Sequence, residues 1–445
     1  MIKLTPQLIS RYNLEGPRYT SYPTVPNWPH TTSPVQYPQI QEPASLYIHV
    51  PFCQKRCFFC ACNVIVKKLS PEIGDTYIDY LSKEMALISI KKVSLKEIHF
   101  GGGTPTYLSD TQLEKLHKEI STYFDLSTLT EMSIEIDPRT ILIERLKTLK
   151  RLGFNRLSFG VQDLDERVQK TINRQLSFEK ILALFLEAKQ LGFKSINADL
   201  IYGLPNQTPL TFQETLKQIT TLNPDRIALY SFAYLPSHHA HQNGFNPKLL
   251  PTPKEKMALF LIARNYFLEA GYVSIAMDHF AKKDDDLALA FKNGTMRRNF
   301  MGYSPQPTRD YIGIGVSAIG SLSHQFFQNI KTLPDYYAKL DQHQLPIARH
   351  YALTQDDIMR QYTIETLMCQ CSLNKKTFLK KFNQHFDEYF KAEQNSLSQY
   401  GLEKLLNQTQ DEIQLTELGQ LFVRNICMVF DAHLNKTSHT YSKTI

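Results

Sequence analysis

The sequence predicts an α/β fold: an open or closed barrel of parallel strands and helices, with an extended N-terminal arm and a smaller, mostly helical C-terminal domain. Three observations predict it. Apolar strand-like runs alternate with helical stretches from residue 45 to about residue 270. Seven prolines lie between Pro17 and Pro43. Strand patterns become sparse beyond about residue 330.

The proline-rich stretch belongs to the predicted arm, residues 1–44. Proline has no amide hydrogen and favours extended backbone, so no regular helix or central strand is expected between Pro17 and Pro43. Aromatic residues lie among the prolines: Tyr19, Tyr22, Trp28 and Tyr37. They favour a segment that packs across the main body, over the active site. A disordered leader is the alternative.

The barrel domain is predicted over residues 45–330. Its six strands are expected at 45–50, 97–100, 131–137, 156–162, 195–203 and 226–234. Its helices are expected at 75–91, from Ser109, up to about Leu152, at 177–192, after Thr208 and at 253–270. Strands and helices that alternate in this way form parallel βαβ units with right-handed crossovers. A doubly wound open sheet is the competing architecture.

Local signals mark where several of these helices begin and end. Ser109 and Gln112 have the spacing of a capping box, and Thr208-Pro209 is typical of an N-cap followed by proline at the first helical position. Gly153 and Gly192 are placed to end helices in a left-handed conformation. The predicted functional segments lie at or beside the carboxyl ends of strands, where α/β barrels carry their chemistry.

A separate domain is predicted at 331–432, with helices beginning near Thr354 and Leu373. A short strand followed by a helix is expected within 411–430, an order that winged-helix modules also have. We interpret this domain as an accessory packing module rather than a DNA-binding one. Residues 433–445 contain no Asp or Glu and few apolar groups, so a flexible tail is expected.

Composition and charge narrow the class of protein. Hydrophobic residues make up 42% and charged residues 21%, an ordinary globular balance. The net charge of +7 is too small for 445 residues to indicate a nucleic-acid partner. No run approaches the roughly 18 apolar residues of a membrane helix, and the start lacks the apolar stretch of a signal peptide. We expect a cytoplasmic monomer without membrane insertion.

The cysteines carry the first chemical signal. Four of seven lie within ten residues, at positions 53, 57, 60 and 62, whereas Cys369, Cys371 and Cys427 are expected to be buried thiols. The spacing Cys53-x3-Cys57-x2-Cys60 can supply thiolates to three irons of a [4Fe–4S] cluster. The fourth iron would then be open to a cofactor or substrate. Structural zinc is the rival reading, but it prefers four closed ligands, and the short step to Cys62 makes chelation of one ion awkward.

The three cysteines, together with Gly101-Gly102-Gly103-Thr104-Pro105 after the second strand, resemble the radical S-adenosylmethionine (SAM) superfamily. A wider set of segments resembles the oxygen-independent coproporphyrinogen III oxidase family over nearly the whole chain. These segments are PRYTSYPT (17–24), SLYIHVPFC (45–53), CFFCACN (57–63), HFGGGTPTYL (99–108), SIEIDPR (133–139), FNRLSFGVQD (154–163), NADLIYGLP (197–205), MDHFA (277–281), GIGVSAI (313–319) and RNICMVFD (424–431). Ala61 stands where that family commonly has glycine.

The resemblance implies a partial (β/α) barrel of the radical SAM type, one [4Fe–4S] cluster on Cys53, Cys57 and Cys60, and two SAM molecules. It implies that a 5′-deoxyadenosyl radical removes a hydrogen from two propionates of coproporphyrinogen III, which become the vinyl groups of protoporphyrinogen IX in haem biosynthesis. The implied contacts of the first SAM are Tyr47, Gly102, Glu135 and Ile319. Those of the second are Phe59, Gly103, Thr104, Gln162, Arg174, Asp199 and Ala233.

Substrate and partners follow from the same resemblance. Because coproporphyrinogen III carries four propionates, basic side chains should bind it; Arg18 and either Arg297 or Arg298 are the candidates. An electron donor and an electron acceptor are also implied, without identities. The sequence assigns no catalytic residue and no role to Cys62.

Alternatives remain at this stage. A haem-binding chaperone on the same scaffold is one, and a zinc-dependent or nucleic-acid-binding protein that uses the C-terminal module is another. The histidines His238, His239 and His241 could form a metal site, although an exposed loop is the simpler expectation.

Overall fold

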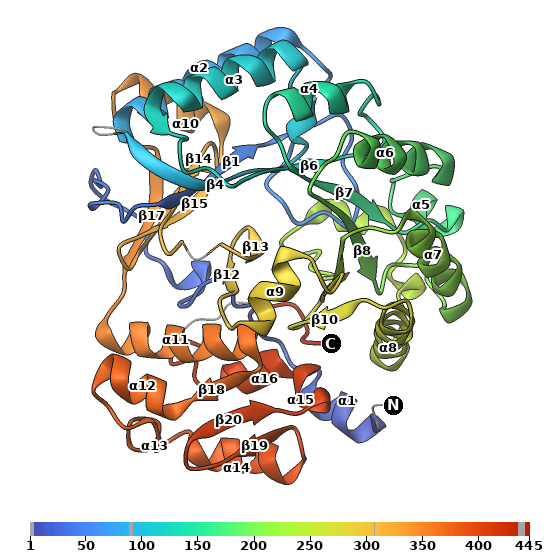
Figure 1. Cartoon of the computed structure of the whole chain (residues 1–445), viewed down its shortest axis with the longest axis vertical. Coiled ribbons are helices and arrows are strands. Elements are labelled where there is room, and N and C mark those ends of the chain that lie inside the picture. The colour runs from blue at the N-terminus through green and yellow to red at the C-terminus, as the bar shows by residue number, and fades with distance from the viewer. Residues whose placement is uncertain (1–3, 89–91, 307, 435–440) are drawn as a thin grey trace.

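One mixed sheet of 13 strands forms the centre of the computed structural model, which describes residues 4–88, 92–306, 308–434 and 441–445. Its main path runs β10-β11-β9-β8-β7-β6-β4-β1-β14-β15-β16-β17. The path ends at two different strands and does not close on itself, so the sheet is a partial barrel (Figure 1).

All six predicted strands are present, adjacent in chain order and parallel to their neighbours. They are β1 (Ala44–Val50), β4 (Val93–Gly102), β6 (Glu131–Ile136), β7 (Arg156–Gln162), β8 (Ser195–Tyr202) and β9 (Arg226–Ser231). Their residues are buried on both faces, as in β1, where six of seven positions are buried. Because the order never reverses, the crossovers all run one way, and the doubly wound alternative is wrong.

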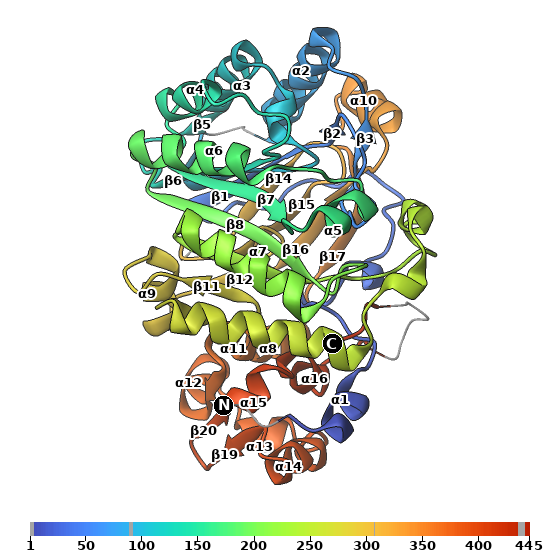
Figure 2. The ribbon, with the colours of Figure 1, turned by 90° about the vertical axis from the view of Figure 1, so that its right-hand side faces the viewer.

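Helices cover the outer face of this parallel part (Figures 1 and 2). They are α2 (Pro71–Ile88), α3 (Asp110–Tyr123), α4 (Arg145–Arg151), α5 (Glu166–Thr171), α6 (Phe178–Gln190), α7 (Pro209–Leu222) and α8 (Pro253–Glu269). The predicted capping box of Ser109 and Gln112 is confirmed, and Gly153 and Gly192 adopt positive φ after their helices. Residues 89–91, the end of one predicted helix, lie outside the described residues.

The sequence missed the second half of the sheet. A seventh parallel strand, β14 (Tyr311–Ile314), pairs with β1, and antiparallel strands extend both edges. They are β10 (Val273–Ile275), β11 (His279–Ala281), β15 (Ile319–Leu322), β16 (Gln325–Asn329) and β17 (Ile347–Ala352). These strands have three to six residues and are joined mostly by tight turns, so they lack the long alternation that marks a strand in sequence.

Shorter elements complete this domain. The strand pairs are β2 (Phe52–Cys53) with β3 (Ile65–Val66), and β12 (Arg297–Asn299) with β13 (Gly302–Ser304), while β5 (Phe124–Asp125) adds to β4. The further helices are α9 (Asp286–Lys292) and α10 (Leu333–Asp341). The 3₁₀ turns are η1 (Val25–Asn27), η2 (Pro105–Tyr107), η3 (Ala240–Gly244) and η4 (Pro247–Leu249).

The N-terminal segment begins with α1 (Pro6–Tyr12), which was not predicted. Between Pro17 and Pro43 the only regular element among the described residues is η1. Trp28 is 1% exposed and stacks on Phe326 of β16, with ring centroids 4.8 Å apart. The Tyr19 hydroxyl donates to Asp431 at 3.0 Å. The aromatic side chains therefore attach this segment both to the sheet and to the C-terminal region.

The C-terminal region combines helices with the small antiparallel sheet β18-β20-β19. Its elements are α11 (Gln355–Gln370), β18 (Ser372–Asn374), α12 (Lys375–Phe382), α13 (Phe386–Tyr389), α14 (Gln394–Leu402), β19 (Leu406–Gln408), β20 (Glu412–Leu415), α15 (Glu417–Gln420) and α16 (Val423–Met428). The helix start after Thr354 and the short strand within 411–430 match the prediction.

The expected flexible tail needs correction. Residues 435–440 lie outside the described residues, but 441–445 are held against the start of the chain. The amide of Thr444 donates to the carbonyl of Leu14 at 2.7 Å, and Ile445 is 4% exposed. Arg424, a buried guanidinium, donates to the carbonyls of Ser442 and Lys443. These backbone acceptors hold the segment, and residue composition does not reveal them.

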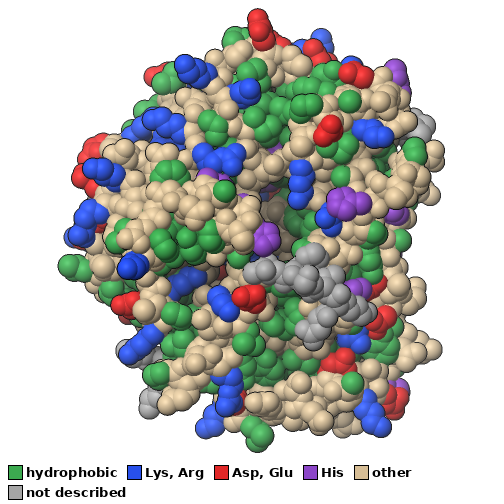
Figure 3. All heavy atoms as spheres, turned by 180° about the vertical axis from the view of Figure 1, so that it is seen from behind, with side chains coloured by type: hydrophobic (Ala, Val, Ile, Leu, Met, Phe, Trp, Pro, Cys, Tyr) green, Lys and Arg blue, Asp and Glu red, His purple; other side chains and the backbone are tan. Residues whose placement is uncertain are grey.

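None of the helices in the described part of the chain is long and apolar enough to cross a membrane. On the face opposite to that of Figure 1, Lys and Arg side chains lie scattered among Asp and Glu (Figure 3).

Candidate active site

A cavity of about 1000 Å³, counted to its open mouth, lies at the carboxyl ends of the parallel strands. Side chains from the ends of β4, β6, β7, β8 and β9 line it together with the cysteine loop that follows β1. This is the end of a β/α barrel at which catalytic groups collect.

The cysteine loop is closed by β2 and β3, which pair Phe52 with Ile65 and Cys53 with Val66. The loop turns within itself through the Cys60 amide, which donates to the Cys57 carbonyl at 3.3 Å. Cys53, Cys57, Cys60 and Cys62 all line the cavity, so the backbone turns all four thiols toward the same space.

The three predicted ligands have different polar neighbours. The Cys53 Sγ lies 3.2 Å from the Thr104 hydroxyl. The Cys57 Sγ accepts hydrogen bonds from two guanidinium groups, Arg139 at 3.3 Å and Arg174 at 3.4 Å. Donors aimed at sulfur favour the thiolate form, which is the form that binds iron.

Asp137 holds these two arginines in place. Arg139 donates to its carboxylate through Nε and, at 2.7 Å, through Nη2. The Arg174 Nη2 lies 3.5 Å from the Asp137 Oδ1. Burial opposes the charge of Asp137, but Arg174 and Arg139 outweigh burial and lower its pKa to about 2. The carboxylate therefore stays ionised and keeps both guanidinium groups beside the sulfur.

The thiols of the cysteine loop differ in their pKa values. Burial raises the pKa of Cys53 to about 12. A hydrogen bond from the Cys62 thiol lowers the pKa of Cys60, and the same contact raises that of Cys62. A bound metal deprotonates a coordinating thiol outright, so the Cys53 thiol would become a thiolate only on binding a metal.

Two glycines at the end of β4 pack closely against β1 and the residues that follow it. Gly102 has φ +113°, and a Cβ there would lie 2.7 Å from the His49 ring. A Cβ on Gly103 would lie 2.6 Å from the Pro51 carbonyl oxygen, which is backbone and cannot move aside. The Gly103 amide donates to the Val50 carbonyl at 2.8 Å, which fixes this close approach. Only glycine lets the two backbones approach so closely.

Glu135, at the end of β6, accepts a hydrogen bond from the Gly102 amide at 3.0 Å and lies 3.4 Å from the His99 ring. Burial opposes its ionisation, but the hydrogen bonds from His99 and Gly102 outweigh this effect and lower its pKa. An ionised carboxylate therefore faces the cavity beside the glycines.

Asp199 is the second carboxylate in the cavity. Burial and the charge of Glu135 raise its pKa to about 6, against hydrogen bonds from Asn197 at 2.8 Å and Ser158 at 3.0 Å. Keeping this charge away from water costs folding free energy, a pattern typical of functional sites.

Gln162 has two unusual features, in its backbone conformation and in its side-chain hydrogen bonding. It is a non-glycine residue with φ +71°, and its Oε1 is buried without a hydrogen-bond partner among the described residues. Nearby, the Arg174 guanidinium lies 5.9 Å from the centre of the Phe59 ring. A buried acceptor with no donor, in a residue that lines the cavity, fits a site completed by a bound molecule.

Eleven of the fourteen predicted site residues line this cavity. They are Cys53, Cys57, Phe59, Cys60, Gly102, Gly103, Thr104, Glu135, Gln162, Arg174 and Asp199. Three do not. Tyr47 lies in β1, its hydroxyl 3.0 Å from the His49 ring; the Ala233 carbonyl accepts from Gln242; and Ile319 pairs with Gln328 in β15.

The predicted substrate arginines line two cavities but lie close together, because the Arg298 guanidinium donates to the Arg18 carbonyl at 3.5 Å. Arg297 and Arg298 line one cavity, whereas Arg18 lines a smaller one with Asp278 and Arg424. The Arg18 guanidinium donates to the Ser231 carbonyl at 2.6 Å.

The histidine loop packs against the cysteine loop. His241 Nε2 donates to the Cys60 carbonyl at 2.6 Å, while His238 is exposed. In the described part of the chain, no three His, Cys, Asp or Glu side chains are arranged to hold a single metal ion. A cubane cluster asks for a different geometry, since each thiolate binds its own iron.

Known proteins resemble this chain in sequence and in structure. The Radical SAM superfamily matches residues 47–219, and the HemN C-terminal domain matches residues 353–422. The oxygen-independent coproporphyrinogen III oxidase of Escherichia coli K12 is 40% identical over 96% of this chain and 95% of its own length. The enzyme of the same name from Synechocystis is 38% identical over 98% of this chain and 97% of its own length. This chain belongs to the oxygen-independent coproporphyrinogen III oxidase family.

The solved structures agree with this assignment. A structure of coproporphyrinogen III oxidase from E. coli, described as a radical SAM enzyme, superposes with a TM-score of 0.90 at 38% identity, covering 97% of this chain and all of the other. The radical SAM fold expected from the cysteine and glycine motifs is therefore confirmed, and this member of the family is an oxidoreductase.

Several residues of the site were missed by sequence reasoning. Asp137, Arg139 and Tyr230 line the cavity. Arg139 donates to the Cys57 sulfur, and Asp137 pairs with Arg139. The run Asp137-Pro138-Arg139 at a strand end was the available signal, since charged residues there face the site of a barrel. Tyr230 left no signal, because an aromatic residue in a strand is usually core.

Proposed function

We propose that this chain catalyses the reaction of its family, the oxygen-independent oxidation of coproporphyrinogen III in haem biosynthesis, converting two propionates into the vinyl groups of protoporphyrinogen IX. One observation carries the proposal: eleven predicted site residues, three cysteines among them, line a single cavity at the catalytic end of the barrel. The family to which the chain belongs supports the substrate and reaction.

A [4Fe–4S] cluster and SAM are the cofactors that membership of the radical SAM superfamily implies. We assign the iron ligands to Cys53, Cys57 and Cys60. When bound, the cluster supplies the electron that splits SAM into the oxidant for a carbon–hydrogen bond. The chain's own part is to orient and shield: Arg139 and Arg174 donate to the Cys57 sulfur, and their partner Asp137 keeps them there.

The assignment of two SAM molecules rests on the remaining lining residues and, through the family resemblance alone, on Tyr47, Ile319 and Ala233, which do not line the cavity. The glycine backbone and the ionised Glu135 suit the amino and carboxylate groups of the first, together with Tyr47 and Ile319. The orphaned Gln162 oxygen, Arg174 and Asp199 suit the second, with Phe59, Gly103, Thr104 and Ala233.

The remaining expectations stay proposals. They are an arm at 1–44 over the active site, a barrel domain at 45–330, a C-terminal domain at 331–432, a cytoplasmic monomer, and an external electron donor and acceptor.

Anaerobic turnover tests the proposal. Protein reconstituted with iron and sulfide should convert coproporphyrinogen III with SAM and dithionite, and should release 5′-deoxyadenosine. Cys57→Ser should lose cluster iron, SAM cleavage and product together. Cys427→Ser, at a buried core thiol that lies outside the cavity and donates to the Ile364 carbonyl, is the matched control and should keep all three. A colourless zinc protein, or retention of added haem without turnover, would contradict the proposal.

A further inference from the structure

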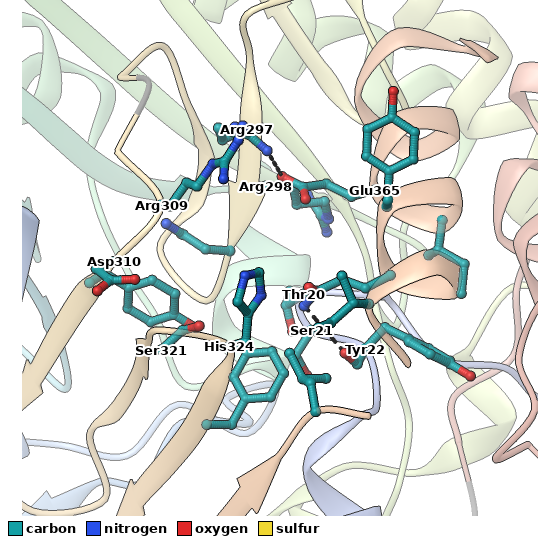
Figure 4. Close-up of a pocket in the computed structure, with 18 of the residues that line it drawn as sticks. Thr20, Ser21, Tyr22, Arg297, Arg298, Arg309, Asp310, Ser321, His324 and Glu365 are labelled. Carbon is teal, nitrogen blue, oxygen red and sulfur yellow. Dashed lines mark hydrogen bonds and ion pairs between the residues drawn. The ribbon is translucent and has the colours of Figure 1, made fainter. Parts of the chain in front are cut away.

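A second large cavity lies away from the cysteines. It has about 1050 Å³, counted to its mouth, and three parts of the chain surround it. The arm contributes Thr20 to Tyr22, the hairpin β12–β13 contributes Arg297 and Arg298, and α11 contributes Glu365 (Figure 4).

Positive charge exceeds negative charge in this cavity. Arg297, Arg298, Arg309 and Lys381 line it, against Asp310 and Glu365, and His324 lies among them (Figure 4).

The carboxylates that are present are already engaged. Glu365 pairs with Arg297 at 3.2 Å. Asp310 accepts from the amides of Gln41 at 2.8 Å and Ser323 at 2.9 Å. Arg298, Arg309 and Lys381 consequently have no carboxylate partner among the described residues.

Two buried polar atoms in lining residues are also unpartnered within the described structure: the Tyr311 hydroxyl and the Arg298 Nε. A hydroxyl and a guanidinium nitrogen are both donors toward an anionic oxygen. Buried donors of this kind normally have an acceptor, so their surroundings are incomplete without a ligand.

The rest of the lining is apolar. Phe326 and Ile364 are buried, and Leu353 and Ile358 lie beside them. Burial and the charges of Arg309 and Arg297 lower the pKa of Lys381, so the cations repel one another in the absence of an anion. An apolar wall facing several unpaired cations suits a flat, apolar ring that carries several carboxylates.

The hairpin β12–β13 connects this cavity with the cysteine site. Arg298 pairs across the hairpin with Tyr303. Tyr303 lines a small inner cavity together with Glu135, Asp199 and Tyr230, and these three also line the cysteine site. A ligand held at the hairpin would therefore be next to the inner cavity that leads to the cofactor residues.

We propose that this basic cavity binds the carboxylates of coproporphyrinogen III, with Arg309 and Lys381 at its mouth and Arg297 and Arg298 deeper inside. The inference rests on the proposed function for its substrate. It replaces the expected grouping of Arg18 with these arginines, because Arg18 lies in another cavity.

Binding can be followed through the chain's single tryptophan. Trp28 stacks on Phe326, which lines the cavity, so a bound porphyrin should quench Trp28 fluorescence. The probe is coproporphyrin III, the stable tetracarboxylate, titrated into the anaerobic holoenzyme. The test variant is Arg309→Gln/Lys381→Gln, because both side chains are exposed and the change should leave folding intact. Lys380→Gln is the matched control on the same helix, exposed and outside the cavity.

We expect the double variant to raise the dissociation constant of coproporphyrin III, and the KM for coproporphyrinogen III, about tenfold, with Lys380→Gln unchanged. Equal values in all three proteins would overturn the inference, as would competition by inorganic phosphate at the same concentrations as coproporphyrin, which would indicate a general anion site. If the wild-type enzyme oxidises coproporphyrinogen III and only these differences are missing, the proposed function stands and this site fails. If the wild type does not turn over, the proposed function fails.

Discussion

Asp199→Asn should separate the functional from the structural role of this carboxylate. Its pKa rises from an ordinary 3.8 to about 6, so its ionised form is disfavoured in the folded protein by about 3 kcal/mol. Asparagine removes the charge and retains an acceptor for Ser158 or Asn197. We therefore expect the cluster-free variant to have a free energy of unfolding about 1–3 kcal/mol higher than that of the wild type at pH 7. Its unfolding temperature should be higher as well.

The sign of the pH dependence follows from the raised pKa. Between about pH 4 and 6 the folded state holds a proton on Asp199 that the unfolded state has released, so wild-type stability falls as the pH rises through this window. The Asn variant has no carboxyl at this position, so its stability does not fall in this way as the pH rises. The difference between the two unfolding midpoints should be near zero at pH 4 and reach its full size above pH 6.

The same substitution that raises stability should weaken SAM binding. On the proposal of two SAM molecules, the anaerobic holoenzyme of Asp199→Asn should bind one equivalent of SAM fewer than wild type, with unchanged iron content. Asp163→Asn is the control, since Asp163 is a buried carboxyl whose pKa is also about 6 but which lies outside the cavity. If Asp199→Asn is less stable at pH 7 and keeps both SAM equivalents, the carboxylate is structural and our reasoning is refuted.

Three further changes probe the site and the chain ends. Gly103→Ala places a Cβ 2.6 Å from the Pro51 carbonyl, and should cost about 1–3 kcal/mol of unfolding free energy and weaken SAM binding in equilibrium dialysis. His241→Ala removes the hydrogen bond to the Cys60 carbonyl, worth about 1 kcal/mol, so a chelator should strip cluster iron about fivefold faster. Deleting residues 441–445 removes the Lys443 carbonyl that accepts from Arg424 and the buried side chain of Ile445, and should lower the free energy of unfolding by about 3 kcal/mol in urea titrations.

Matched controls sharpen these tests. Gly401→Ala lies in α14, where the new Cβ would be 3.9 Å from the Leu406 carbonyl oxygen, and should be neutral or stabilising. His238→Ala, in the same loop as His241 but exposed, should leave iron release unchanged. An unchanged urea midpoint after the deletion would restore the expectation of a flexible tail.

Part of the fold could be predicted because its signals are local. Strands such as 45–50 and 156–162 are long and apolar, and caps such as Ser109 with Gln112 depend on a few neighbouring residues. The short antiparallel strands from Val273 to Ala352 have no comparable local signal, because each is stabilised by pairing with a distant strand.

The sequence by itself determined the chemistry available at the active site: three closely spaced cysteines, a glycine run after a strand, and carboxylates at strand ends. Tertiary structure decided which groups meet. It placed Arg139 beside the Cys57 sulfur, directed the Arg18 side chain to a different cavity from Arg297, and brought the arm, α11 and the β12–β13 hairpin around one basic cavity. These contacts join residues far apart in the chain, and only packing of the whole domain fixes the distances between them.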